Sequence, residues 1–307
     1  MPPRDVAFVF PGQGSQRRGM LDALPPVDAL DRLLDAAEAL TGLELRAVAL
    51  LGSEEDLADT RVAQPLLYLA DWAWGAALLE ANVTPAALAG HSLGELAALA
   101  LAGVYSVEAG LQLVAERSRL MAAAAAGSAG GMAAVLGMEA ETVAYAVADI
   151  PGVWVANDNA PGQVVLSGTH EGLEAATKGL TEAGARKVVP LKVAGAFHSP
   201  LMQPAGDAFA EVLAATSFAD ALWPVVQNAD PVPTRDGTEI RARLAEQITA
   251  PVHWTDTMAA LRRAGAAVLV EAGPGGVLKG LARRVEGLEA VSVEDGGLEA
   301  VVAKVGA

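Results

Sequence analysis

The sequence is poor in several residue types, and each shortage excludes a class of protein. None of its 307 residues is cysteine, so disulfides, thiolate nucleophiles and cysteine-ligated metals are excluded. Basic residues are also scarce: 21 Lys and Arg stand against 37 Asp and Glu, a formal charge of −16. Nucleic acid and anionic membranes bind surfaces with a cationic footprint, so we expect neither as a partner. An acidic protein partner would need a local basic patch.

Aromatic residues and long apolar runs are missing as well. Phe, Trp and Tyr make up 4% of the chain, so Ala, Leu and Val must fill the core of a sequence that is 52% hydrophobic. The longest aliphatic runs are interrupted before the roughly 18 residues that a membrane span needs. The amino-terminal segment lacks the apolar stretch of a signal peptide. We therefore expect a monomeric, cytoplasmic protein.

Strand-like and helix-like segments alternate along the chain, which favours an α/β fold. Residues 128–195 have their own order: strand, helix, a hairpin turning at residues 159–162, helix, and a closing strand over residues 186–193. This βαββαβ order predicts a small ferredoxin-like subdomain. Because α/β sequence flanks it on both sides, we expect it to be inserted into a large subdomain made of residues 1–127 and 196–307.

A nucleophile motif lies at residues 90–94, which read Gly-His-Ser-Leu-Gly and fit G-x-S-x-G. An apolar strand leads into it and an Ala/Leu-rich helix leads out, the context of a nucleophile elbow. The glycines allow a sharp turn, and the helix amino terminus directs N–H groups at developing negative charge. Ser92 is the predicted nucleophile. The alternative is a serine that only caps the helix.

A serine hydroxyl needs a base, and the chain has only four histidines. His91 is adjacent to the nucleophile, where successive side chains diverge, so a structural role in the elbow is favoured. His170 is expected to cap a helix, and His253 to be a packing residue. His198 remains, where the predicted insertion returns to the large subdomain. Elimination and position favour it as the base.

Arg117 stands out by helical phase. In the helix that Ser106 is expected to cap, Arg117 falls on the apolar stripe formed by Val107, Leu111, Val114 and Met121. A buried arginine needs an anionic partner. That partner is either one of the chain's own carboxylates or a substrate carboxylate held by the guanidinium fork.

Together these residues resemble the malonyl-CoA:acyl-carrier-protein transacylases, acyltransferases of fatty-acid and polyketide synthesis. The resemblance covers nearly the whole chain. The similar segments, in family order, are residues 10–16 (FPGQGSQ), Gln64-Pro65, residues 90–95 (GHSLGE), Arg117, residues 159–165 (NAPGQVV), residues 196–202 (AFHSPLM), Gln247 before residues 251–254 (PVHW), and residues 271–275 (EAGPG).

The resemblance implies an α/β-hydrolase-like large subdomain and an active site between the two subdomains. The backbone N–H groups of Gln13 and Leu93 would form the oxyanion hole. A main-chain carbonyl at Gln247 would hold the His198 imidazole in place of a carboxylate. Arg117 would bind the substrate carboxylate. Gln64, His91, Asn159 and Phe197 would support the site. Phe197 is similar to malonyl-selective members, although Gly195 departs from synthase-embedded malonyl domains.

The implied reaction is ping-pong transfer of malonyl from malonyl-CoA to the phosphopantetheine thiol of acyl carrier protein, without metal or cofactor. Arg186, Lys187 and Lys192 bracket the predicted closing strand and form a candidate dock for an acidic carrier. Three alternatives remain: the malonyl-transferring subunit of malonate decarboxylase, with similar chemistry; a serine esterase or thioesterase of α/β-hydrolase type; and a non-catalytic docking subunit.

Overall fold

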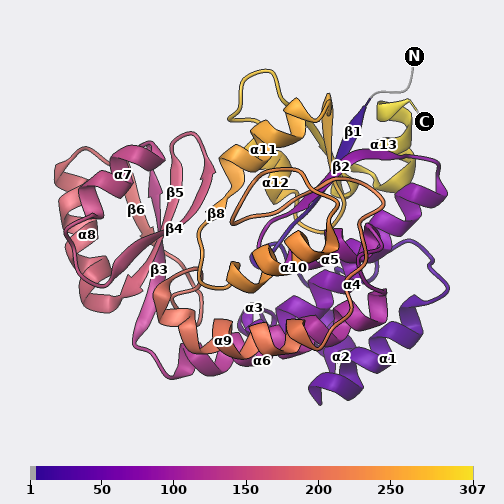
Figure 1. Ribbon diagram of the computed structural model, residues 1–307, viewed down its shortest axis with the longest axis horizontal. Coiled ribbons are helices and arrows are strands. Elements are labelled where there is room, and N and C mark those ends of the chain that lie inside the picture. Colours follow the sequence, from indigo (N-terminus) through magenta and orange to yellow (C-terminus); the bar gives the residue numbers. More distant parts are fainter. Residues whose placement is uncertain (1–4, 307) are drawn as a thin grey trace.

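Two β-sheets with helices around them form the protein (Figure 1). The computed structural model describes residues 5–306. The smaller sheet lies with α7 and α8 at the left of Figure 1, and the larger sheet lies with the remaining helices at the right. The fold is therefore mixed α/β, as the alternation of segments predicts.

The larger sheet has five parallel strands in the order β10-β9-β1-β2-β7. Alternate residues of its central strand pack into different hydrophobic clusters: Phe8 and Phe10 in one, Ala7 and Val9 in another. Both faces are thus covered, which explains why this strand is an unbroken apolar run. The strands are β1 (Val6–Phe10), β2 (Pro85–Gly90), β7 (Val225–Val226), β9 (Val268–Glu271) and β10 (Glu289–Ser292).

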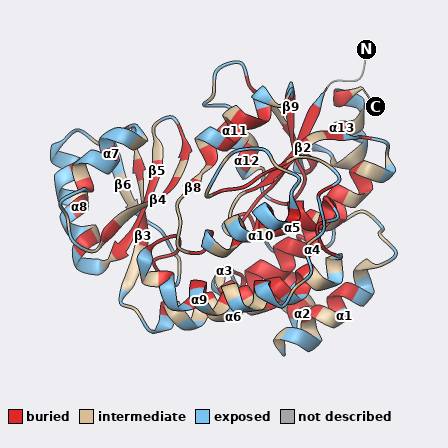
Figure 2. Cartoon of the chain, in the orientation of Figure 1, coloured by how far each residue is buried: buried red, intermediate tan, exposed pale blue. Residues whose placement is uncertain are grey.

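Helices cover the larger sheet, and Figure 2 shows that burial concentrates on the strands, α4 and α5, while α1 and α2 present exposed faces. The Ser106 hydroxyl accepts the Ala109 N–H and caps α6, as predicted. The helices are α1 (Leu30–Thr41), α2 (Leu45–Leu51), α3 (Glu54–Ala58), α4 (Thr60–Glu80), α5 (Gly94–Leu101), α6 (Val107–Ala126), η1 (Pro200–Met202), α9 (Gln203–Ala214), α10 (Gly237–Glu246), α11 (Trp254–Arg263), α12 (Val277–Ala282), η2 (Val293–Asp295) and α13 (Gly297–Val305).

The smaller sheet has the order β6-β3-β5-β4-β8. In its central strand β5, Val164 and Leu166 pack towards α7 and α8, while Val165 packs into the main core on the other face. Both faces of this sheet are therefore buried. Its elements are β3 (Gly130–Leu136), α7 (Ala140–Val147), β4 (Val153–Ala160), β5 (Gln163–Thr169), α8 (His170–Glu182), β6 (Lys187–Pro190) and β8 (Val252–His253).

Four details differ from the sequence prediction. The hairpin strand β4 continues through Ala160, so only Pro161 and Gly162 turn, with Gly162 at φ 72°. The closing strand, predicted over residues 186–193, is β6 and ends at Pro190. Thr169 caps α8, and His170 is only its first residue. The two-residue strand β8 pairs with β4 although it lies far outside residues 128–195.

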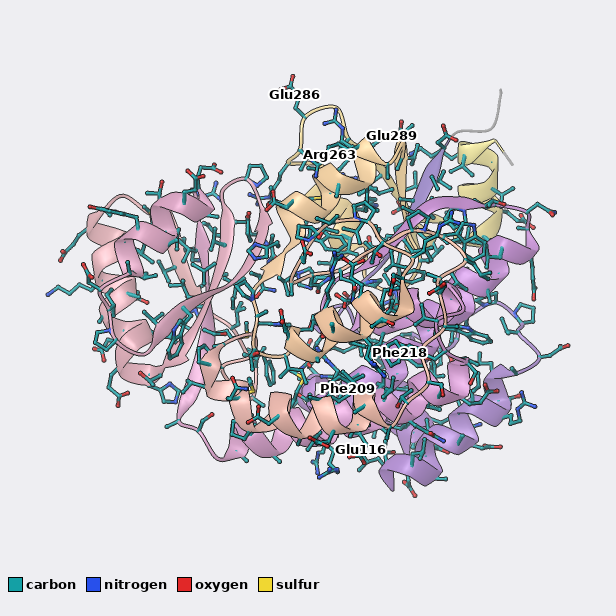
Figure 3. The ribbon with its side chains drawn as sticks, viewed as in Figure 1. Glu116, Phe209, Phe218, Arg263, Glu286 and Glu289 are labelled. Atoms are coloured by element: carbon teal, nitrogen blue, oxygen red, sulfur yellow. The ribbon has the colours of Figure 1, made fainter. Side chains whose placement is uncertain are left out.

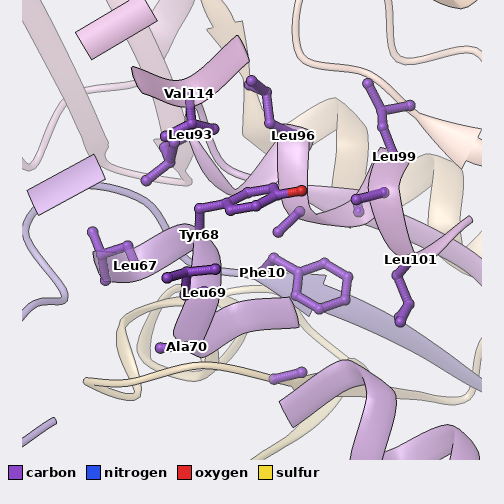
Figure 4. Close-up of a cluster of buried hydrophobic side chains, with 14 of the residues drawn as sticks. Phe10, Leu67, Tyr68, Leu69, Ala70, Leu93, Leu96, Leu99, Leu101 and Val114 are labelled. Carbon is purple, nitrogen blue, oxygen red and sulfur yellow. The ribbon is translucent and has the colours of Figure 1, made fainter. Parts of the chain in front are cut away.

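The main core lies between α4, α5, α6 and the larger sheet (Figure 4). Tyr68 is fully buried there among Leu67, Leu93 and Leu96, and its hydroxyl donates to the Val107 carbonyl at 2.9 Å. This bond joins α4 to the start of α6. Figure 3 shows that Phe209 of α9 also turns inward to this core, whereas Glu286 turns outward. The helix that carries Arg117 is thus fixed against a rigid aliphatic core.

Candidate active site

Ser92 lies at the turn between β2 and α5, at the carboxyl edge of the parallel sheet. Its φ is 51°, a left-handed conformation that non-glycine residues rarely adopt and that recurs at functional sites. The flanking glycines are required because space is absent: a Cβ on Gly90 would lie 1.9 Å from the Gly94 carbon, and one on Gly94 would lie 2.1 Å from the Phe10 oxygen. The tight turn therefore lifts the hydroxyl out of the backbone.

His198 contacts this hydroxyl directly. The Ser92 Oγ lies 2.7 Å from His198 Nε2, and His198 Nδ1 lies 3.0 Å from the Gln247 carbonyl oxygen and 3.1 Å from that of Ala250. A carbonyl oxygen can only accept, so Nδ1 carries the proton and Nε2 is free to accept one. Burial, together with the smaller effects of Arg117 and His91, lowers the pKa of His198 to about 3. The imidazole is thus neutral at physiological pH.

Arg117 reaches the same hydroxyl from α6 and is fully buried. Its guanidinium donates to Gln64 Oε1 at 2.8 Å, to Gln247 Oε1 at 2.9 Å and to Ser92 Oγ at 3.2 Å. Burial lowers its pKa to about 10, against the attraction of Glu95, so it stays charged at neutral pH. No carboxylate within residues 5–306 forms an ion pair with it. Of the two partners left open by the sequence, the internal one is not seen.

Gln247 links the three groups. Its side-chain Oε1 accepts from Arg117, its Nε2 donates to the Ser92 carbonyl at 2.9 Å, and its own carbonyl faces His198. Gln64 is buried on the opposite side of the guanidinium, with Nε2 3.5 Å from the Met121 sulfur. Two uncharged amides thus orient the arginine, and neither of them neutralises its charge.

The sequence reasoning missed Asn228, which follows β7. Its Oδ1 accepts the Ser92 N–H at 2.6 Å, its Nδ2 donates to the Gly90 carbonyl at 2.6 Å, and its own N–H donates to the buried Glu95 at 2.8 Å. Asn228 therefore holds the backbone of the elbow at both Gly90 and Ser92. The only available signal was a polar Gln227-Asn228 pair directly after a short apolar run.

Gln13 and Leu93 line the same pocket as Ser92. Among the loop and cap hydrogen bonds of the described residues, neither backbone N–H has an acceptor, whereas the Ser92 N–H is occupied by Asn228. The Gln13 side chain points elsewhere and donates to the Ala58 carbonyl at 3.2 Å. Two unoccupied N–H groups therefore remain beside the nucleophile.

His91, Asn159 and Phe197 surround the reacting groups without touching the Ser92 hydroxyl. His91 Nε2 lies 2.8 Å from Asn159 Oδ1, and its ring packs at 5.4 Å from that of Trp254. Burial lowers the pKa of His91, so it is neutral. Phe197 is buried and lines the pocket. The other two histidines are elsewhere: His253 begins α11, and His170 lines a separate groove along α8.

The pocket at Ser92 has a volume of about 130 Å³ and adjoins an open cleft of about 1800 Å³. Both are lined by Gln16, Ala58, Lys192 and Val193, so the cleft leads to the nucleophile. The three candidate docking cations are therefore divided. Lys192 lies at the pocket mouth, whereas Arg186 and Lys187 are exposed at the far start of β6. The described residues contain no cluster of three metal-ligating side chains.

The geometry of a strained serine, a neutral histidine and a buried cation on an α/β sheet defines a serine-dependent acyl-transfer enzyme. Comparison with known proteins agrees: residues 7–304 match the acyl transferase domain family. The chain belongs to this family and, within it, to the malonyl-CoA:acyl-carrier-protein transacylases, which confirms the family predicted from the motifs.

Three relatives illustrate the likeness. The chain is 43% identical to a malonyl CoA-acyl carrier protein transacylase of Synechocystis sp., over 91% of this chain and 93% of that protein. The crystal structure of the Coxiella burnetii malonyl CoA-acyl carrier protein transacylase is 32% identical, with a TM-score of 0.92 over 99% of this chain and 98% of the other. A malonyl-transacylase solved in complex with its type II PKS acyl-carrier protein is 37% identical, with a TM-score of 0.89 over 94% and 96%. No helix within residues 5–306 is long and apolar enough to cross a membrane.

Proposed function

We propose that this acyltransferase moves the malonyl group of malonyl-CoA to the phosphopantetheine thiol of an acyl carrier protein through a malonyl ester on Ser92. The observation that carries the proposal is the buried guanidinium of Arg117, which lies 3.2 Å from the Ser92 hydroxyl and has only uncharged hydrogen-bond partners. A buried cation that makes no ion pair favours a substrate that brings its own carboxylate. Malonyl has such a carboxylate, and acetyl does not.

The first half of the reaction acylates the serine. His198 Nε2 takes the hydroxyl proton as Ser92 Oγ bonds to the thioester carbonyl carbon. The carbonyl oxygen becomes an oxyanion, and the free N–H groups of Gln13 and Leu93 are its proposed donors. The C–S bond then breaks, the sulfur takes the proton from His198, and CoA leaves as a thiol. In the second half the carrier thiol attacks the ester by the same steps in reverse.

The base works without an acidic third member. Its Nδ1–H is held by the carbonyls of Gln247 and Ala250, which fix the tautomer but carry no charge. A serine esterase of α/β-hydrolase type would place a carboxylate there. This arrangement, together with Arg117, favours the transferase over the esterase. The proposed steps need neither metal nor redox cofactor.

The topology supports a finer description of the fold. We infer an α/β-hydrolase-like large subdomain of residues 1–127 and 196–307 from the parallel sheet and the β2-Ser92-α5 elbow. We infer a ferredoxin-like small subdomain of residues 128–195 from the βαββαβ order and the strand order β6-β3-β5-β4. A monomer in the cytoplasm remains part of this proposal.

The Ser92→Ala variant tests the proposal. Wild-type protein mixed with malonyl-CoA should gain the mass of one malonyl group, and the variant should gain none, because within residues 5–306 the Ser92 hydroxyl is the only one hydrogen-bonded to the His198 ring. Transfer from the isolated malonyl-enzyme to holo acyl carrier protein separates this function from that of a malonate decarboxylase subunit. A variant that acylates at the wild-type rate contradicts the assignment of the nucleophile.

A further inference from the structure

One polar side chain in the Ser92 pocket has no role in the steps above. Asn157 is only 6% exposed, lines the pocket together with Ser92 and His198, and its Oδ1 has no hydrogen-bond partner among residues 5–306. A buried amide oxygen without a partner is unfavourable by itself, because it has lost its water and gained nothing in return. The position therefore suits a ligand that brings a polar group.

The neighbours of Asn157 do not satisfy its amide. Its Nδ2 lies 3.5 Å from His91 Nε2, the same nitrogen that lies 2.8 Å from Asn159 Oδ1. An amide oxygen only accepts, so this Nε2 carries a proton and offers nothing to a second donor. Rotating the Asn157 amide by a half-turn would bring Oδ1 to His91 and leave Nδ2 without a partner. In both orientations one polar end of this pocket-lining amide is unpaired among residues 5–306.

The backbone explains why this side chain faces the site. The register between β4 and β5 shifts between Val155 and Asn157 and again between Asp158 and Ala160. Such bulges insert an extra residue and re-aim the side chains beside it, and they recur next to active sites. Asn157 lines the Ser92 pocket and Asn159, two residues on, reaches His91, while Asp158 between them accepts a hydrogen bond from Thr255 at 2.7 Å.

We propose that the Asn157 side-chain amide binds the amide of the thioester arm that lies nearest the sulfur. This inference rests on the proposed function. In malonyl-CoA and in a phosphopantetheine-bearing carrier alike, two methylene groups separate the sulfur from the first amide. With the thioester carbonyl at Ser92, that amide falls inside or at the mouth of the pocket that Asn157 lines. A carboxamide offers both a donor and an acceptor, so either orientation of Asn157 can pair with it.

A double comparison tests the contact between Asn157 and the amide: wild type and Asn157→Ala are each assayed with two thioesters. One substrate is malonyl-S-N-acetylcysteamine, which keeps the amide, and the other is the malonyl thioester of an alkanethiol of equal length, which lacks it. Formation of the malonyl-enzyme is followed by intact mass, and the ratio of the two acylation efficiencies is compared. Asn157→Ala should lower that ratio by about 3- to 10-fold, the usual effect of one neutral hydrogen bond, with the alkyl thioester changed less than about twofold.

The Thr255→Ala variant is the matched control, because it removes a hydrogen bond from the same strand outside the pocket and should leave the ratio unchanged. Asn157→Leu, of similar volume, replaces Asn157→Ala if the latter does not fold, and the same fall is expected. An unchanged ratio in the Asn157 variant, or an equal fall in Thr255→Ala, overturns the inference. Failure of wild-type protein to form any malonyl ester would instead overturn the proposed function.

Discussion

Two side chains from distant parts of the chain meet at one oxygen atom, the Ser92 Oγ. His198 lies 2.7 Å and Arg117 3.2 Å from it, and Gln247 holds both of them. The positive charge of Arg117 disfavours protonation of His198. After burial, it is the next largest cause of the low pKa of His198. A bound malonyl carboxylate would neutralise Arg117 and so raise the basicity of His198 when substrate is present.

The pH dependence of acylation follows from this residue pair. The base is active when neutral, and a pKa of about 3 keeps it neutral throughout the physiological range. The kcat/KM for malonyl-CoA, which reports the free enzyme, should therefore stay nearly constant from pH 7.5 to pH 5. A base with the ordinary pKa of 6.5 would lose about thirtyfold over the same range. Stopped acylation reactions measured by mass distinguish the two, and an acid limb centred near pH 6.5 would contradict the buried, neutral histidine.

Arg117 is expected to determine the substrate class. Arg117→Ala should lower the malonyl:acetyl ratio of kcat/KM by at least about tenfold, since a charge-assisted bidentate pair contributes roughly 1.5–3 kcal/mol. Arg117→Lys should restore little, because an ammonium cannot reproduce the planar fork. Both thioesters are measured, together with a melting curve. If Arg117 is only structural, the two activities fall in parallel with stability, and the carboxylate-binding role is wrong.

At the scale of elements, β6 and the segment after it separate two kinds of cation. Arg186 and Lys187 are exposed at the start of the strand, while Lys192, beyond its end, lines both the open cleft and the Ser92 pocket. A docking surface for an acidic carrier protein is expected at the former pair. Lys192 instead lies at the mouth of the Ser92 pocket, where we expect the arm of either thioester to enter.

Charge reversal tests this division. The double variant Arg186→Glu, Lys187→Glu should raise the KM for the carrier protein. It should leave the KM for malonyl-CoA unchanged, because we expect CoA to make no contact with the start of β6. Lys192→Glu should raise both. Steady-state kinetics with each substrate varied in turn measures the difference. Unchanged carrier kinetics in the double variant would eliminate this patch as the dock.

At the scale of the whole molecule, two further carboxyl groups, those of Glu271 and Asp71, are buried. Glu271 ends β9 and accepts the Leu278 and Lys279 N–H groups at the start of α12, at 3.0 and 2.9 Å. Burial raises its pKa to about 7. Asp71 of α4 is fully buried, and burial together with Glu271 raises its pKa well above its ordinary value. Both carboxyls therefore favour the protonated form in the folded state.

Stability should respond to pH in a defined direction. A raised pKa means that Glu271 contributes stability fully below its unfolded value of 4.5 and loses it as pH rises through about 7. Relative to Glu271→Gln, the wild type should therefore lose up to about 3 kcal/mol between pH 4.5 and 8. Denaturant midpoints at several pH values measure this. The exposed Glu286→Gln is the control and should show no such trend, and a flat difference for Glu271→Gln would contradict the buried acid.

The sequence alone determined the features whose causes are local. The spacing of apolar residues and the positions of glycine predicted the strand before Ser92, the helix after it and the inward-facing position of Arg117. Each of these features depends on residues within a few turns of a helix or within one short motif. Tertiary structure decided the rest. Gln247 and Asn228 reach Ser92 from 155 and 136 positions away in the chain, and Gln64 reaches Arg117 across 53 positions; no short-range pattern encodes such approaches. Likewise, only packing could decide that β8 joins the smaller sheet. The same holds for two features of residues 5–306: Arg117 forms no ion pair with their carboxylates, and Asn157 Oδ1 has no hydrogen-bond partner among them.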